Sequence, residues 1–227
     1  MAPNANKSTA RTSNAIITFT NLDIRYPSQA TRCTIPFARQ TPLVYSPVTM
    51  NSASGLPFAK SRLPIVLVGL MGVGKSTVGR RLAQRLALPF VDADHAIVEA
   101  AGMTIAEIFD RYGEDHFRDG ERRVIARLMD GQPKVIATGG GAFINEQTRG
   151  LLLEKSIVIW LDADIETLLE RVGRKNDRPL LRDGNPKEIL MRLAQERNPV
   201  YANAHVHVMS QTNPHDATVD SILKAIM

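Results

Sequence analysis

The chain has 227 residues, of which 44% are hydrophobic and 22% charged, with a formal net charge of +5. This composition is typical of a folded globular protein and excludes collagen-like and wholly disordered chains. No run approaches the roughly 20 apolar residues that span a bilayer, and the single cysteine, Cys33, cannot form an internal disulfide.

The positive charge is concentrated in the first fifty residues, which hold five basic residues and one acid, Asp23. The rest of the chain carries 23 basic and 22 acidic residues. The folded part therefore has no overall bias toward a polyanion, and we expect no nucleic-acid partner and no membrane association.

Residues 1–62 are rich in Ser, Thr, Asn and Pro and show no sustained helical or strand period, which predicts a disordered extension. Three explanations remain open: a natural start at Met50, an acid-poor transit peptide for a plastid or mitochondrion, or a functional arm. We expect a cytoplasmic protein, or a plastid protein if the extension is a transit peptide.

From Pro64 onward, short apolar runs alternate with helical patterns. The predicted strands are Ile65–Val68, Pro89–Val91, Lys134–Thr138, Ile157–Leu161 and, more weakly, His205–Met209. Helices are expected at Lys75–Leu86, between about Asp94 and Met129, from Asn145, from Asp164 and after Pro214, with a capping-box pair at Thr104 and Glu107. This alternation predicts an α/β domain over 63–227 with a parallel sheet covered on both faces.

The strongest motif is the loop between the first strand and the first helix, which reads G-L-M-G-V-G-K-S from Gly69 to Ser76. Its glycines let backbone N–H groups form an anion nest, and the following helix adds its positive N-terminal end. Lys75 can reach the β- and γ-phosphates, and the Ser76 hydroxyl can bind Mg²⁺. The loop therefore predicts a nucleoside triphosphate site, and the absence of an N-K-x-D motif argues against a GTPase.

Acidic residues end two of the predicted strands, and either could lie near the metal. Asp162 follows an apolar run like that of a Walker B strand, whereas Asp92 ends the strand directly after the first helix. Asp94 lies at the same edge and either serves an acceptor hydroxyl or caps the next helix.

Arginines and glycines form a second set of candidate residues. Arg118 and Glu121 are spaced as an ion pair that can present the guanidinium to a carboxylate. Three consecutive glycines, Gly139 to Gly141, follow a buried strand, where a ligand can approach bare N–H groups. The polar stretch from 171 to 182 reads as a lid carrying Arg178, and Arg197 lies near a helix end.

Two simpler expectations concern side chains outside these motifs. His205 and His207 alternate on a strand and could pair on a metal, but exposure on a peripheral strand is the favoured interpretation. Met103, Met129 and Met191 are expected to fill the core from helical positions.

Six segments in order resemble the shikimate kinases, a family of the nucleoside monophosphate kinase fold group. They are the phosphate loop, D-A-D at 92–94, F-R-x-x-E at 117–121, G-G-G at 139–141, R-P-L-L at 178–181 and E-R-N-P-V-Y at 196–201. The resemblance implies ATP-dependent phosphorylation of the 3-hydroxyl of shikimate, in chorismate and aromatic amino-acid synthesis. It also implies a five-stranded parallel sheet, a substrate-binding segment, a lid, a Mg²⁺ cofactor and a monomer.

The resemblance further assigns a role to each site residue. The ATP phosphates would contact Gly72, Val73, Gly74, Lys75, Ser76 and Thr77, with Arg178 reaching them from the lid and Arg171 lying against adenine. Mg²⁺ would bind Ser76 directly and Asp92 through water. Asp162 would then resemble a Walker B acid without binding the metal. Shikimate would contact Arg118, Arg197 and Gly139 to Gly141. Asp94, Lys75 and Arg178 would be catalytic, with Asp94 orienting or deprotonating the attacking hydroxyl.

Overall fold

The computed structural model describes residues 63–173, 185–210 and 215–227. Residues 1–62, Arg178 and Pro214 lie outside these ranges, and the expectations about them stay predictions. The described residues form elements in the order β1 (Ile65–Val68), α1 (Lys75–Leu86), β2 (Phe90–Asp92), α2 (Ala93–Ala101), α3 (Ile105–Leu128), β3 (Val135–Ala137), α4 (Glu146–Lys155), β4 (Ile157–Asp162), α5 (Ile165–Gly173), α6 (Pro186–Tyr201), β5 (Val206–Met209) and α7 (His215–Ile226).

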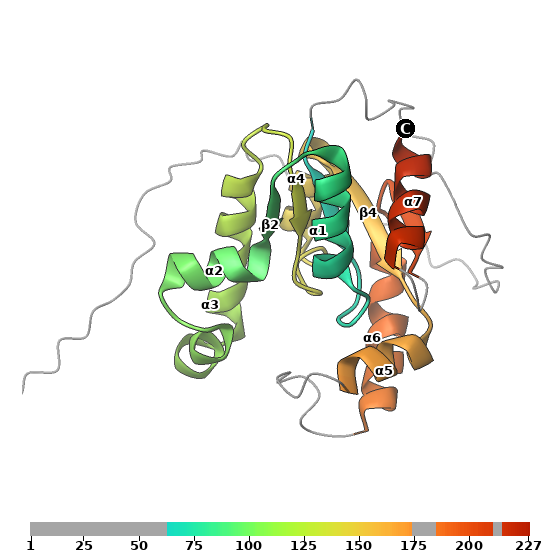
Figure 1. Ribbon diagram of the computed structural model, residues 1–227. Coiled ribbons are helices and arrows are strands. Elements are labelled where there is room, and N and C mark those ends of the chain that lie inside the picture. The colour runs from blue at the N-terminus through green and yellow to red at the C-terminus, as the bar shows by residue number, and fades with distance from the viewer. Residues whose placement is uncertain (1–62, 174–184, 211–214) are drawn as a thin grey trace, which may run out of the picture. The chain divides into compact units, whose positions relative to one another are not determined.

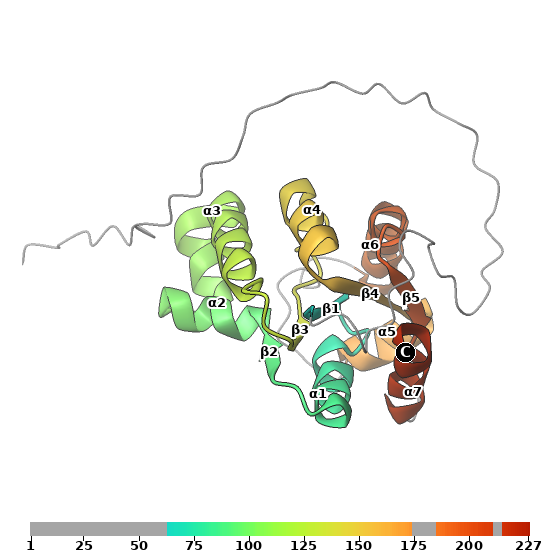
Figure 2. The same ribbon diagram turned by 90° about the horizontal axis from the view of Figure 1, so that it is seen from above.

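The five strands form one parallel sheet in the order β2-β3-β1-β4-β5. Helices cover both faces: α1 and α7 lie on one side of the sheet, and α3, α4 and α6 lie on the other (Figures 1 and 2). The predicted α/β fold with a five-stranded parallel sheet is therefore confirmed. None of the described helices is long and apolar enough to cross a membrane.

The centre of the sheet is buried because its strands are covered on both faces. All four residues of β1 have no exposed surface, and β4 contributes the buried run Val158–Leu161. Continuous apolar runs of this kind are what a parallel sheet between two helical layers requires. The strands therefore fix the position of the loops that follow their carboxyl ends.

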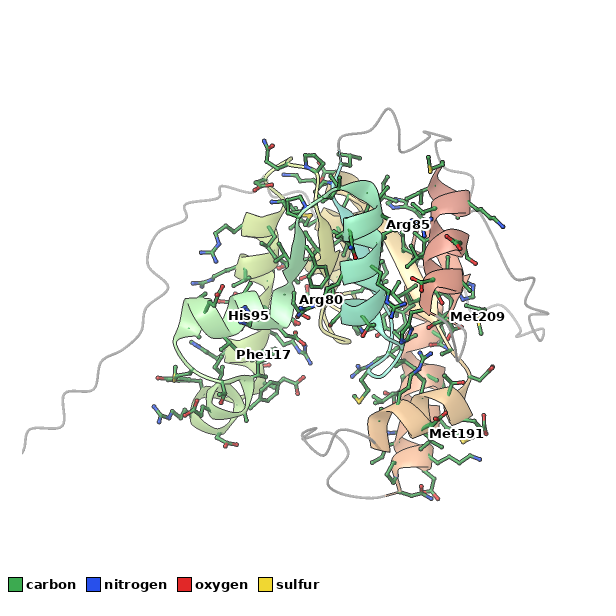
Figure 3. The ribbon with its side chains drawn as sticks, viewed as in Figure 1. Arg80, Arg85, His95, Phe117, Met191 and Met209 are labelled. Carbon is green, nitrogen blue, oxygen red and sulfur yellow. The ribbon has the colours of Figure 1, made fainter. Side chains whose placement is uncertain are left out.

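Helix α3 is bent, and helix α7 packs beside α1. In α3 the backbone leaves the helical conformation at Gly113, where φ is 80° and ψ 176°, so the segment that carries Phe117 starts a new direction (Figure 3). Helix α7 is tied to α1 by two ion pairs, Arg81–Asp216 at 2.9 Å and Arg85–Asp220 at 3.1 Å.

Two expectations about side chains are wrong. His207 is buried, because its ring stacks on Trp160 at 4.0 Å and its Nε2 lies 3.2 Å from Oδ2 of Asp162. His205 is partly buried, and its Nδ1 accepts a hydrogen bond from the backbone N–H of Val158. Met129 is buried and Met103 packs partly buried against the core, as expected, but Met191 is 52% exposed on α6 (Figure 3).

Candidate active site

The phosphate loop turns from β1 into α1 through glycines with positive φ. Gly72 has φ 83° and Gly74 has φ 100°, and a Cβ atom at Gly72 would lie 2.8 Å from the side chain of Val172. Gly74 is the N-cap of α1 and has no side chain to cap the first-turn amides, which stay available to an anion. Nζ of Lys75 donates to the carbonyl oxygens of Gly69 and Leu70, both at 2.8 Å, so the ammonium lies over the loop.

The opposite side of the loop is held through the carbonyl of Val73. Nη1 of Arg171 and Oγ of Ser210 both donate to this oxygen at 3.0 Å, and Arg171 also donates to Ser210 at 3.2 Å. Arg171 lies in the last turn of α5, so the first residues of the stretch predicted as a lid, 171–173, belong to a helix. The arginine expected at the adenine is therefore bonded to the phosphate loop itself.

Oxygen donors suited to a hard cation lie beside the start of α1. Oγ of Ser76 donates to Oδ2 of Asp92 at 2.7 Å, and Oδ1 of Asp92 accepts from the N–H of Asp94. Asp92 is thus the N-cap of α2, and Asp94 does not cap that helix. The other acidic candidate, Asp162, contacts His207 and the N–H of Ala163. Of the two acids, the structure brings Asp92 to the Ser76 hydroxyl.

Arg118 is held between two carboxylates on α3. Its Nη1 donates to Oε2 of Glu121 at 2.8 Å, and its Nε and Nη2 donate to Oε1 of Glu114 at 3.2 and 3.0 Å. The Glu121 side chain is only 4% exposed, whereas that of Glu114 is 64% exposed. Burial raises the pKa of Glu121, and Arg118 opposes that rise. The expected pairing of Arg118 with Glu121 is present.

The three glycines after β3 bring these side chains together. A Cβ atom at Gly139 would lie 2.9 Å from Oδ1 of Asp94 and 3.0 Å from Oε1 of Glu121. A Cβ atom at Gly141 would lie 2.5 Å from Nη1 of Arg118. A side chain at either position would displace Asp94, Glu121 or Arg118, so glycine lets the backbone lie directly against these groups.

Gly140 lies where the glycine run meets both the phosphate loop and α6. A Cβ atom at this residue would lie 3.5 Å from the carbonyl oxygen of Gly69 and from the nitrogen of Met71. Its carbonyl oxygen accepts from Nη1 of Arg197 at 3.4 Å and from the hydroxyl of Tyr201. The structure therefore gathers the phosphate loop, the glycine run and Arg197 at one edge of the sheet.

Two contacts at this edge were not predicted: Tyr201 with Gly140, and Ser210 with Val73. They join residues 61 and 137 positions apart. No local pattern in the sequence signals such pairs, although Tyr201 is the last letter of the motif E-R-N-P-V-Y. Ser76 and Thr77 are exposed at the start of α1, as a binding surface requires.

Comparison with known proteins assigns the chain to a family. The family model described as shikimate kinase matches residues 71–227. Shikimate kinases of Novosphingobium aromaticivorans and Bradyrhizobium diazoefficiens are 60% and 52% identical; these alignments cover 72% and 79% of this chain and 86% and 87% of the relatives. A solved shikimate kinase of Acinetobacter baumannii in complex with shikimate is 39% identical with a TM-score of 0.68, covering 74% of this chain and 94% of that one. This chain belongs to the shikimate kinase family.

Proposed function

We propose that this protein transfers the γ-phosphoryl group of ATP to the 3-hydroxyl of shikimate, giving shikimate 3-phosphate and ADP for chorismate and aromatic amino-acid synthesis. The observation that carries the proposal is the meeting of the phosphate loop with the glycine run at Gly140, between Gly69, Met71 and Arg197. A phosphoryl donor and a carboxylate acceptor can thereby lie side by side.

On the donor side, the residues from Gly72 to Thr77 bind the triphosphate, with the first amides of α1, which have no side-chain cap, as donors. Lys75 exchanges its bonds to the Gly69 and Leu70 carbonyls for phosphate oxygens, because phosphate carries a negative charge opposite to that of the ammonium and a carbonyl does not. Arg178 lies outside the described residues, and its contact with the phosphates is proposed on the resemblance alone.

The donor set at Ser76 and Asp92 fits Mg²⁺, which prefers hydroxyl, carboxylate and water oxygens. Ser76 would hold the ion directly and Asp92 through water. When bound, Mg²⁺ neutralises charge on the phosphates. The Asp92 carboxylate also caps α2 through the N–H of Asp94, so the same group connects the metal side with the acceptor side.

On the acceptor side, Arg118 and Arg197 receive the carboxylate of shikimate, with N–H groups of the Gly139–Gly141 run as further donors. Glu121 fixes the guanidinium of Arg118 from the buried side. Gly141 lies directly against that guanidinium, so its backbone is within reach of a carboxylate bound there.

Asp94 orients the attacking hydroxyl and accepts its proton. As the new bond forms between the shikimate oxygen and the γ-phosphorus, the bond from that phosphorus to the bridging oxygen of ADP breaks. The proton of the hydroxyl passes to the carboxylate of Asp94, which lies next to Gly139 and Glu121. Catalysis is therefore positioning plus charge stabilisation, with one proton transfer.

A coupled ADP-release assay on the full chain tests this proposal. We expect Mg²⁺-dependent turnover with shikimate and none above background with gluconate or nucleoside monophosphates. Turnover with gluconate or a nucleotide in place of shikimate would refute the proposed substrate. Light scattering during gel filtration tests the further proposal that the protein is a monomer.

A further inference from the structure

Tyr201, the last residue of α6, has a side chain that the proposed mechanism does not use. It has no exposed surface, and its ring packs against Phe143, with centroids 6.4 Å apart, and against Trp160, with centroids 6.0 Å apart. Burial raises the pKa of Tyr201 to about 12. The hydroxyl therefore keeps its proton, and a buried hydroxyl needs an acceptor for it.

That acceptor is the carbonyl oxygen of Gly140, the middle residue of the glycine run. Arg197, one helical turn earlier on α6, donates to the same oxygen at 3.4 Å. Gly140 in turn lies against the phosphate loop at Gly69 and Met71. The phenol thus binds the backbone at Gly140, which lies close to both the phosphate loop and Arg197.

The orientation of this peptide group decides where the next amide points. In a trans peptide, a carbonyl and the N–H that follows it point in opposite directions. Holding the Gly140 carbonyl toward α6 therefore turns the N–H of Gly141 away from α6. Gly141 is also the residue that lies against the Arg118 guanidinium.

We propose that Tyr201 is a positioning residue for the acid substrate: its hydroxyl fixes the Gly140–Gly141 peptide so that the run presents its N–H beside Arg118. This role rests on the proposed function, because it requires a carboxylate bound at Arg118. It predicts that the phenol hydroxyl affects the acceptor and leaves the nucleotide almost untouched.

Tyr201→Phe removes only the hydroxyl and keeps the ring against Phe143 and Trp160. Loss of one intramolecular hydrogen bond that orients a binding group predicts a rise of about five- to thirty-fold in KM for shikimate. KM for ATP is expected to stay within about twofold, since the Val73 and Lys75 contacts of the phosphate loop are intact. Replacement of Tyr201 by p-aminophenylalanine restores a donor and is expected to return KM for shikimate to within about threefold of the parent value.

Ser156→Ala is the matched control. Its buried hydroxyl donates to the carbonyl of Leu152 at 2.6 Å, and it precedes β4 at the amino end of the sheet, away from the site. Both substitutions delete one buried hydroxyl, so both should lower Tm by a few degrees. Emission from Trp160, the single tryptophan, reports whether the packing around residue 201 is retained.

The outcomes separate this role from a purely structural one. A selective rise in KM for shikimate that p-aminophenylalanine reverses supports the proposal. An equal rise in both KM values, an unchanged KM for shikimate, or a p-aminophenylalanine variant no better than Tyr201→Phe would overturn it. Absence of shikimate turnover in the parent protein would instead refute the proposed function, so the two failures are distinguishable.

Discussion

Arg118 offers the sharpest perturbation of the acceptor side. Its guanidinium lies against Gly141 and is held by the buried Glu121, so its truncation would remove the proposed charge-assisted contact with the substrate carboxylate. Such losses cost about 2–5 kcal/mol. The side chain is 27% exposed and Arg197 remains, which favours the lower end, about 2–3 kcal/mol, or roughly a 30- to 150-fold rise in KM for shikimate.

The assay is the coupled ADP-release assay with each substrate varied in turn. Arg118→Ala is expected to raise KM for shikimate by this factor and KM for ATP by less than about threefold. Arg118→Lys keeps the charge without the planar fork and should recover only part of the loss. Arg122→Ala is the control, because Arg122 lies one turn further along α3, where it is 31% exposed and paired with Asp119 at 2.6 Å.

Removing Arg118 alone also leaves the buried carboxyl of Glu121 without its main partner. Arg118 lowers the pKa of Glu121 against the effect of burial, so in its absence the carboxyl takes up a proton more readily. The double variant Arg118→Gln/Glu121→Gln removes both charges and separates binding from folding. If Arg118→Ala and the double variant raised both KM values equally, the carboxylate-clamp role would be refuted.

Three further predictions concern catalysis, the nucleotide and pH. Asp94→Asn should lose most turnover while ATP still binds, measured by calorimetry beside the kinetic assay; normal turnover would remove Asp94 from the chemistry. Ser210→Ala removes one of the two side-chain hydrogen bonds to the Val73 carbonyl and keeps the one from Arg171. Because this carbonyl belongs to the phosphate loop, the variant should raise KM for ATP about threefold to tenfold and leave KM for shikimate unchanged. An effect on shikimate alone would contradict that assignment. Burial lowers the pKa of His205 from its ordinary value of 6.5, so below pH 6.5 the imidazole binds a proton more readily in the unfolded chain than in the folded one. The free energy of unfolding therefore falls as the pH drops below 6.5. Urea titrations between pH 5 and 7.5 should show this loss reduced in His205→Asn, whereas identical pH profiles would contradict the explanation.

Much of the fold follows from local patterns. The run Ile65–Val68 is apolar at every position, which is the pattern of a strand covered on both faces, and all four residues are buried. The phosphate loop needs glycine at positions with positive φ, so its composition reports its conformation directly. The capping box at Thr104 and Glu107 is likewise a contact over three residues and is confirmed.

The errors concern contacts between distant parts of the chain. His207 is buried because its ring stacks on Trp160 and its Nε2 contacts Asp162, both on the neighbouring strand β4. The alternation of residues along β5 does not show which side chains the neighbouring strand presents. The helices expected between about Asp94 and Met129 include no bend at Gly113, where the backbone leaves the helical conformation. Met191 is the opposite case, an apolar residue that is exposed, because a single apolar residue does not show which face of a helix packs against the core.

The candidate site is only partly predictable for the same physical reason, because its residues come from distant parts of the chain. Short motifs of glycine, arginine and aspartate indicate the candidate residues, because each motif is a run of neighbouring residues that can be recognised in the sequence. Their meeting at Gly140 depends on the sheet order, which places β3 beside β1. The bonds from Tyr201 and Ser210 to the two loops depend on that order as well, so they required the structure.

The most direct test of the account is a crystal structure of the protein with a non-hydrolysable ATP analogue and shikimate bound together. We predict that the shikimate carboxylate lies against Arg118 and Arg197, that its 3-hydroxyl lies at Asp94, and that the terminal phosphate lies over the amides that start α1. Shikimate bound with its carboxylate turned away from both guanidinium groups, or with Asp94 remote from the 3-hydroxyl, would contradict it.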